Sequence, residues 1–200
     1  MRTKSEAKRD AIMAVALNVF REVGFDAASM SQIAARVGGS KATLYNYFSS
    51  KEELLLAAML DSGDKYAHEV LQLLQTPGDL PTQLHRFVVS LLKLIGSSEP
   101  IEILRVAISV GGTSDIGRQF YELGTHNVWI EIAKVLREEV SKGNLRDSDP
   151  DLMAMLLRSL CESELIRNLL GAGRAMNDKE VEANASCIVD IFLRVYGTAW

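Results

Sequence analysis

The segment from Ser29 to Phe48, which reads SMSQIAARVGGSKATLYNYF, constrains the fold of this chain more than any other stretch. Ser29 is followed at capping-box spacing by a glutamine, so it is placed to start a helix. Gly38 and Gly39 end that helix, since glycine adopts the left-handed turn conformation without a steric penalty. Ser40 can then cap a second helix. The segment therefore predicts two short helices joined by a tight turn.

The second of these helices has one buried and one outward face. Leu44 and Phe48 lie four residues apart and therefore share the face that packs into a core. The other side chains point outward or lie on the flanks, and these are Lys41, Ala42, Thr43, Tyr45, Asn46 and, at the border of the core face, Tyr47. A helical pair of this layout is typical of the helix-turn-helix, whose second helix enters the major groove of DNA.

The residues around this motif resemble the signature of the TetR family of transcriptional regulators. The run from Gly38 to Phe48 and the run from Ser50 to Leu54 carry the resemblance. Further along, the segment from Ile101 to Gly171 is similar to the ligand-binding domains of the AefR-like type in that family. The chain departs from the family pattern at Gly39, where a small β-branched residue is usual, and at Asn46, where histidine is frequent.

The resemblance implies a role in DNA binding for each outward residue. Lys41, Ala42 and Tyr45 would approach base edges, with the alanine offering a methyl contact to thymine. The residues expected to hold phosphates, which fix register without selecting sequence, are Ser29, Ser40, Thr43, Asn46 and Lys51, with Tyr47 beside them. One such helix covers only a few base pairs, so we expect a homodimer on double-stranded operator DNA.

The charge of the chain is unevenly divided. Residues 1–50 hold seven basic and four acidic residues, a net of +3, so the other 150 residues carry −7 of the total of −4. A basic N-terminal segment followed by an acidic remainder concentrates the attraction for phosphate near the motif. A random distribution of charges along the chain gives differences of this size too. No apolar run is long enough to span a membrane and no secretory core opens the chain, so we expect a cytoplasmic protein without a membrane partner.

The rest of the chain has helical periodicity, and no stretch alternates with the period of a β-strand. Caps, glycines and prolines predict helices over residues 6–23, 51–75, 80–95, 98–111, 114–141 with an interruption near Gly124, 150–170 and 178–195. We therefore predict an all-α fold. Residues 1–50 would form a three-helix DNA-binding domain with the motif at 29–48, and residues 51–200 a helical effector-binding and dimerisation domain.

The last two predicted helices carry long apolar stripes. They can simply pack inward, whereas the resemblance to the TetR family gives them a second role as the four-helix bundle of a dimer. The predicted interface residues are Met155, Ser159, Ile166, Val181, Ala185, Ile188 and Phe192.

An aromatic cluster in the central helices marks the candidate effector pocket. The residues proposed to line it are Arg105, Phe120, Tyr121, His126 and Trp129. An apolar pocket with a few polar groups suits a small organic effector, and the competing interpretation is that these side chains fill the core.

Enzymatic chemistry has little support in the sequence. The chain has no phosphate loop, no GxGxxG and no nucleophile elbow. Glu122 and His126 are four residues apart, but two ligands fall short of a metal site. We expect no catalytic residue, no metal and no cofactor.

The expected function is that of a DNA-binding transcriptional regulator, a repressor that releases its operator when a small apolar effector binds. Two other interpretations stay open. The chain can be a helical binding protein whose N-terminal motif is only structural, or a helical enzyme with an unrecognised site.

Overall fold

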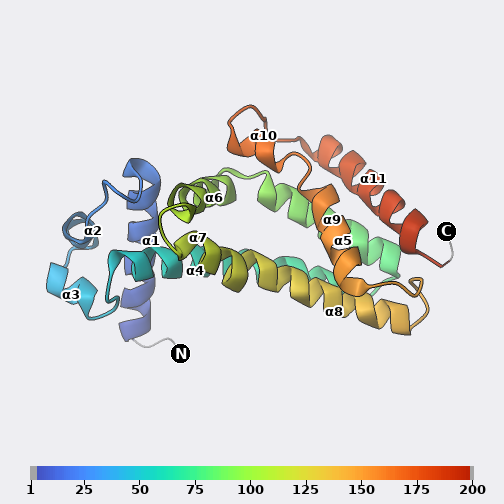
Figure 1. Ribbon diagram of the computed structural model, residues 1–200, viewed down its shortest axis with the longest axis horizontal. Coiled ribbons are helices and arrows are strands. Elements are labelled where there is room, and N and C mark those ends of the chain that lie inside the picture. Colours follow the sequence, from blue (N-terminus) through green and yellow to red (C-terminus); the bar gives the residue numbers. More distant parts are fainter. Residues whose placement is uncertain (1–3, 199–200) are drawn as a thin grey trace. The chain divides into compact units, whose positions relative to one another are not determined.

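The computed structural model describes residues 4–198, and within that range it contains helices and no strand (Figure 1). The predicted all-α fold is therefore confirmed. The helices, in chain order, are α1 (Lys4–Val23), α2 (Met30–Val37), α3 (Lys41–Tyr45), α4 (Lys51–Gln72), α5 (Leu80–Ile95), α6 (Ser98–Gly111), α7 (Ile116–Phe120), α8 (Asn127–Ser141), α9 (Pro150–Cys161), α10 (Leu165–Leu169) and α11 (Asp178–Tyr196). A 3-10 turn, η1 (Leu73–Gln75), follows α4, and a π-helical turn, η2 (Tyr121–His126), joins α7 to α8.

Several helix starts follow from the capping residues that the sequence offers. The side chain of Asp79 accepts a hydrogen bond from the Thr82 amide at the start of α5, at 3.0 Å. At the start of α11, Asn177 and Glu180 form both bonds of a capping box. These caps satisfy amide groups that have no partner inside the helix, and they define the N-terminal ends as predicted.

One predicted helix is wrong. The segment 150–170 is not continuous, because α9 ends at Cys161 and α10 starts again at Leu165. Residues 162–164 bury no side chain fully, and Ser159 bonds back to the carbonyl of Met155 at 2.9 Å. The backbone turns at this point, where the Leu165 amide donates to the carbonyl of Glu162 at 2.9 Å.

The chain divides into two compact units. The first takes residues up to Asp64 together with Glu102–Gly124, and the second takes Lys65–Ile101 together with the residues from Thr125 onward. This differs from the single boundary after residue 50 that the sequence predicts. A segment of fifty residues buries little apolar surface by itself, and in this chain the core around the motif recruits α6 and α7.

The core of the first unit lies under the helix-turn-helix. Ile12 and Phe20 of α1, Ile33 of α2 and Leu44 of α3 are completely buried in it. The later helices add Ile103, Val106, Ala107, Val110 and Ile116. An ion pair between Arg21 of α1 and Glu102 of α6 lies at the edge of this core.

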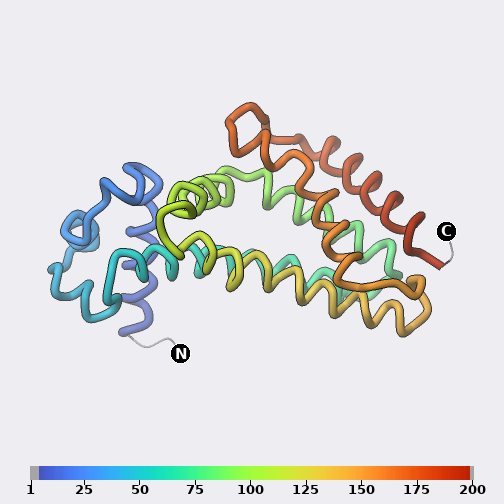
Figure 2. The backbone as a smooth tube through the Cα atoms, viewed as in Figure 1, coloured from blue at the N-terminus to red at the C-terminus, as the bar shows by residue number. Residues whose placement is uncertain are grey.

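The second unit is a helical bundle in which α11 packs along α5 and α8 along α9, as the backbone trace shows (Figure 2). Phe87 of α5 and Trp129 of α8 meet edge to face in its core, with ring centroids 6.3 Å apart. The end of α11 is held to the loop before α9 by a bridge between Leu145 and Gly197. The Arg146 amide adds a 2.7 Å hydrogen bond to the carbonyl of Tyr196.

Candidate nucleic-acid interface

The turn between α2 and α3 has the geometry that its sequence predicts. Gly38 adopts φ 71° and ψ 40°, in the left-handed region, and its amide donates to the carbonyl of Ala35 at 3.3 Å. The Gly39 amide donates to Ala34 at 3.0 Å. Ser40 then starts α3, because its Oγ accepts a hydrogen bond from the Thr43 amide at 3.0 Å. Two helices thus follow each other with a turn of three residues.

Helix α3 separates a buried from an outward face. Leu44 is completely buried, and Phe48, just beyond the helix, is 1% exposed. Lys41, Ala42 and Tyr45 are exposed on the other side, with Tyr45 at 45%. These burial patterns match the sequence prediction, so the side chains proposed to approach base edges are open to solvent.

The outward face of α3 also carries a cation–aromatic pair. The ammonium group of Lys41 lies 5.8 Å from the centroid of the Tyr45 ring. A cation over a ring is attracted to its negative face, so the pair restricts both side chains before DNA arrives. Two other bases of this region form ion pairs, Arg21 with Glu102 and Arg36 with Glu22. Their charge is partly neutralised within the subunit.

The hydroxyl groups proposed to hold phosphates act first as helix caps. Ser29 accepts from the Gln32 amide at 3.2 Å, and Ser40 lies 2.9 Å from the hydroxyl of Thr43. A hydroxyl carries two lone pairs and one proton, so the Ser29 cap leaves that proton for an external acceptor. Asn46 is exposed at the end of α3, whereas Tyr47 is partly buried against the first core.

Lys51, at the start of α4, has partners within its own subunit. We expected its ammonium group to face phosphate, but Nζ instead donates to the carbonyls of Phe25 at 2.7 Å and Ala28 at 3.1 Å. It also lies 4.1 Å from the centroid of the Phe25 ring. A cation in the first turn of a helix is unfavourable with respect to the helix dipole, and carbonyl oxygens offset that cost without a phosphate. These contacts lie within the subunit, and the phosphate contact predicted for Lys51 stays a prediction.

A neighbouring serine that the sequence did not single out completes the start of α4. Both the amide and the hydroxyl of Ser49 donate to Glu53 Oε2 at 2.6 Å, and Ser50 accepts from the Glu53 amide at 3.0 Å. The Ser49 hydroxyl, followed by its amide, holds the pKa of Glu53 below its usual range. The two halves of a capping box at the start of α4 are thus shared between Ser49 and Ser50.

The residues proposed for the effector pocket belong to different parts of the fold. Arg105, Phe120 and Tyr121 lie in the first compact unit, and His126 and Trp129 in the second. Trp129 is buried in the core of the second unit, while Arg105 and Tyr121 are exposed. The aromatic signal in the sequence thus includes a core residue, as the competing interpretation stated. The carboxylate of Glu122 is paired with Arg118 at 2.8 Å.

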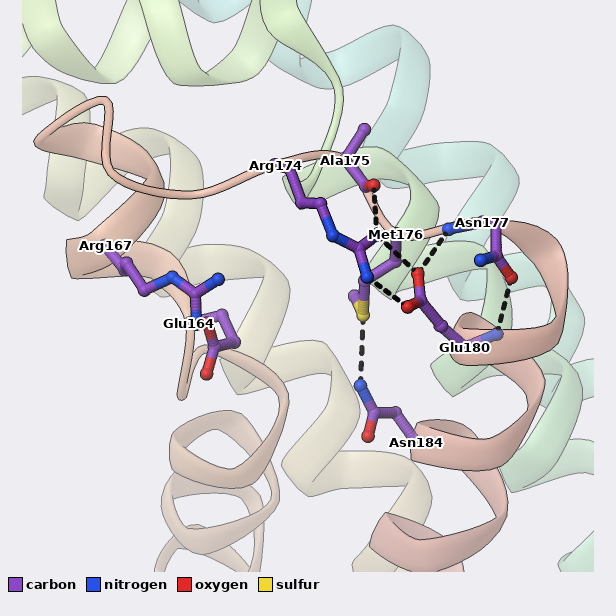
Figure 3. Close-up of polar contacts among 8 residues, drawn as sticks. All are labelled: Glu164, Arg167, Arg174, Ala175, Met176, Asn177, Glu180 and Asn184. Carbon is purple, nitrogen blue, oxygen red and sulfur yellow. Dashed lines mark hydrogen bonds and ion pairs between the residues drawn. The ribbon is translucent and has the colours of Figure 1, made fainter.

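The described cavity in the second unit is lined by other residues, several of them charged. Figure 3 shows the hydrogen bonds and side chains of six of these lining residues. Its volume is about 360 Å³, and its lining residues are Gly96, Glu164, Arg167, Asn168, Arg174, Met176, Glu180, Ala183 and Asn184. Arg174 forms a two-point ion pair with Glu180, and Arg167 pairs with Glu164 at 2.8 Å. None of the predicted pocket residues lines this cavity.

The predicted dimer residues divide into buried and exposed groups. Val181, Ala185, Ile188 and Phe192 are buried in the core of their own unit, which corrects their assignment to an intersubunit surface. Helix α11 lies against α5 and α9, so its most regular apolar stripe is used inside the subunit. The large exposed apolar residues of α9, α10 and α11 are Leu152, Met155, Leu156, Ile166, Ile191 and Val195, with Leu170 directly after α10, and Ser159 of α9 is exposed as well.

A folded pair of short helices with a left-handed glycine turn and an outward polar and aromatic face defines a DNA-binding protein of the helix-turn-helix class. The family model described as the AefR-like transcriptional repressor, C-terminal domain, matches residues 82–198, more than half of the chain. The model described as bacterial regulatory proteins, tetR family, matches residues 12–58. The chain belongs to the TetR family of transcriptional regulators, which are DNA-binding proteins and not enzymes.

Known relatives agree with this assignment. The chain is 36% identical over 94 residues to the transcriptional activator FasR of Mycolicibacterium smegmatis, covering 47% of this chain and 43% of FasR. It is 42% identical over 64 residues to the transcriptional repressor TetR of Mycobacteroides abscessus, covering 32% of this chain and 33% of that protein. The chain thus spans less than half the length of these curated relatives.

Solved structures match over nearly the whole chain. A TetR-family transcriptional regulator from Mesorhizobium loti MAFF303099 superimposes with a TM-score of 0.88 and 26% identity, covering 98% of this chain and 100% of that one. The flavonoid-responsive regulator FrrA gives a TM-score of 0.78 and 26% identity, covering 97% and 99%. Within residues 4–198, no helix has the length and apolar character needed to cross a membrane.

Proposed function

We propose that this regulator is a homodimeric repressor that releases operator DNA when a small organic effector binds. The outward face of α3 supports the proposed DNA-binding surface, because Lys41, Ala42 and Tyr45 are exposed there beside the buried Leu44. Base edges in the major groove offer acceptors to the lysine and thymine methyl groups to the alanine. Phosphates would be held by Ser29, Ser40, Thr43 and Asn46.

Fluorescence anisotropy with the DNA upstream of its own gene tests this surface. Tyr45→Ala should weaken operator binding by about 1–3 kcal/mol, the range for one base contact, and change binding to random DNA much less. Tyr121→Ala is the matched control, because Tyr121 is 48% exposed and lies outside the motif. An equal loss of affinity for operator and random DNA in Tyr45→Ala would remove the base-edge role.

The homodimer is supported by the exposed apolar residues of α9 and α11. Leu152 and Met155 of α9 are 43% and 54% exposed, and Ile191 and Val195 of α11 are 42% and 52% exposed. A contiguous patch of exposed apolar side chains marks an interaction surface, and we propose that these residues form one. A two-fold dimer uses the same patch on both subunits, and it also matches the repeated half-sites of an operator.

Charge substitution separates the outward from the inward face of α11. Ile191→Glu places a carboxylate in water in the monomer, but buries it unpaired in the proposed dimer, an arrangement that is strongly penalised. The variant should run as a folded monomer in size-exclusion chromatography with light scattering. Ile108→Glu is the control, since Ile108 is 62% exposed on α6. An Ile191→Glu dimer with unchanged affinity would move the interface elsewhere.

The proposed effector and the proposed direction of regulation are inferred from the descriptions of similar proteins. FrrA is described as flavonoid-responsive, and the matching C-terminal family model is described as a repressor domain, whereas FasR is an activator. These descriptions favour a small organic effector and repression in this chain. In vitro transcription from the upstream promoter gives the direction, because a repressor lowers transcript yield and an activator raises it.

Tryptophan fluorescence tests the effector. Trp200, the other tryptophan of the chain, lies outside the described residues and would first be replaced by phenylalanine. If the effector binds next to the core of the second unit, as we propose, an organic ligand found by thermal-shift screening should perturb Trp129 emission and release operator DNA over the same concentration range. By linkage, operator DNA should weaken ligand binding by the same factor. A ligand that binds equally with and without operator would not be an inducer.

A further inference from the structure

We propose that the cavity between α10 and the start of α11 binds a small organic carboxylate, held by the guanidinium group of Arg167 and the side-chain amide of Asn184. This site is additional to the effector pocket proposed near Trp129. The inference does not depend on that pocket, on the direction of regulation or on DNA binding. All residues that line the cavity belong to the second unit.

Three segments supply the walls of the cavity (Figure 3). Arg167 comes from α10, Met176 from the loop before α11, and Asn184 from the second turn of α11. The volume is about 360 Å³, and since a cavity of roughly 150 Å³ accepts a benzene ring, there is room for a ring with a charged group. Met176 and Ala183 give this lining an apolar side for the body of such a molecule.

The two arginines of the cavity differ in how firmly their carboxylate partners hold them. Arg174 makes a two-point ion pair with Glu180, and its Nη1 also donates to the carbonyl of Ala175 at 3.2 Å. Glu180 in turn accepts a hydrogen bond from the Asn177 amide at 2.9 Å, as part of the capping box of α11. The pair of Arg174 and Glu180 is therefore built into the start of the helix, and Arg174 has little capacity for another anion.

Arg167 is held much more loosely. Among the described residues its guanidinium makes one ion pair, in which Nη1 lies 2.8 Å from Oε2 of Glu164, and both side chains are at least half exposed. An ion pair this exposed contributes little to stability. A guanidinium has five N–H donors in a planar fork, so this pair leaves most of them for a second acceptor. Arg167 can therefore bind a carboxylate without the loss of a buried interaction.

A second donor of the cavity is matched with a weak acceptor. The side-chain nitrogen of Asn184 donates to Sδ of Met176 at 3.0 Å, as the dashed line in Figure 3 marks. A thioether is a weak acceptor, so a carboxylate oxygen is the stronger partner for an N–H group of this amide.

The charge of the lining favours a monoanion. Two arginines are balanced by the carboxylates of Glu164 and Glu180, so the lining has no net charge. A phosphate dianion would be repelled by both carboxylates, whereas a single carboxylate matches the planar fork of Arg167 in shape and charge. The ligand class that these groups fit is consequently a carboxylate with a small apolar body.

Fluorine NMR titrations of the wild-type protein, in its solution assembly and at constant ionic strength, test the site. The probes are para-fluorobenzoate and its neutral analogue para-fluorobenzamide. We expect saturable binding of para-fluorobenzoate, on the order of tenfold tighter than that of the amide, because only the carboxylate forms charged hydrogen bonds with Arg167. Equal affinities for the two probes, or no saturable binding of para-fluorobenzoate, would overturn the inference. The second result would also follow if another subunit covered the cavity.

Substitutions then locate the bound probe. Arg167→Gln removes the guanidinium, and Asn184→Asp replaces a donor by a carboxylate that repels the probe. Each should weaken para-fluorobenzoate on the order of tenfold and leave para-fluorobenzamide unchanged. Both side chains are exposed, so we expect wild-type thermal midpoints for these variants.

Arg137→Gln is the matched control, because Arg137 belongs to the same unit, is similarly exposed at 54%, pairs with Asp151 and does not line the cavity. It should bind para-fluorobenzoate with wild-type affinity. An unchanged affinity in Arg167→Gln, or an equal loss in Arg137→Gln, would show that the carboxylate binds elsewhere and would reject the site.

Discussion

The two adjacent glycines of the turn should respond to alanine in opposite ways. Gly38 has φ 71° and ψ 40°, and a Cβ there meets nothing within 4 Å. The cost of Gly38→Ala is therefore confined to the backbone. An L-residue in the left-handed region costs about 1–2 kcal/mol. The lower entropy of the unfolded chain returns about 0.4–1 kcal/mol of this. We expect a net loss of about 1 kcal/mol.

Gly39 is not in the left-handed region, and a Cβ there makes ordinary contacts with Thr43, at 3.8 Å from its Cβ and 3.9 Å from its Cγ2. Gly39→Ala should therefore stabilise the protein by about 0.4–1 kcal/mol through the unfolded state alone. The two variants should then differ by about 1.5–2 kcal/mol, although they are neighbours with identical chemical changes.

Urea unfolding followed by circular dichroism at fixed protein concentration measures this difference. The midpoint should fall for Gly38→Ala and rise for Gly39→Ala with an unchanged denaturant slope, since neither variant alters the buried surface. Thermal midpoints should separate by several degrees, at about 2–4 °C per kcal/mol for a chain of this size. A destabilised Gly39→Ala, or a Gly38→Ala as stable as the wild type, would refute the assigned turn geometry.

The remaining predictions concern the second unit. The pKa of Glu180 is lowered to about 2, first by the Arg174 side chain and then by the Asn177 amide, so its contribution to stability is complete above the unfolded pKa of about 4.3 and is lost as pH falls toward 2. Glu180→Gln should consequently flatten the fall in thermal midpoint over that acid range. Ile188→Ala should lower the free energy of unfolding by about 2–5 kcal/mol, because it opens a cavity in the core. In the Ile191→Glu monomer, alkylation at pH 8 should modify the exposed Cys187 and spare Cys161, whose pKa is raised by burial to about 12, and mass spectrometry of the labelled peptides would show the opposite order if α9 or α11 were rotated.

Local sequence signals predicted where the helices begin better than they predicted which surfaces those helices contact. The start of α5 and the capping box of α11 follow from Asp79 and Asn177, because a cap is decided by residues three positions apart. Helix α11 has apolar residues on two faces, and periodicity selects the more regular stripe without showing whether it meets its own subunit or a second one. Ile188 and Ile191 illustrate the ambiguity, since they are chemically identical and are 8% and 42% exposed.

The candidate site shows the same limit. The burial of Leu44 and the exposure of Tyr45 follow from helical spacing over a few residues. The partner of Lys51 does not, because the carbonyls that it contacts lie 26 and 23 residues earlier in the chain. A lone positive charge at a helix start indicates that an acceptor is needed, but only the folded loop shows that the acceptor is supplied by the protein itself.

The bridge between Leu145 and Gly197 also sets an order of events during protein synthesis. The loop before α9 is held by the last turn of α11, through the Arg146 amide and the carbonyl of Tyr196. The first unit ends at Gly124, so all of its residues have been synthesised while the second unit still lacks α11, whose last turn holds the loop before α9. At typical translation rates of about 5–20 residues per second, the DNA-binding unit precedes the completed second unit by several seconds. We therefore expect the first unit to be complete, and able to fold, while the second unit still lacks α11.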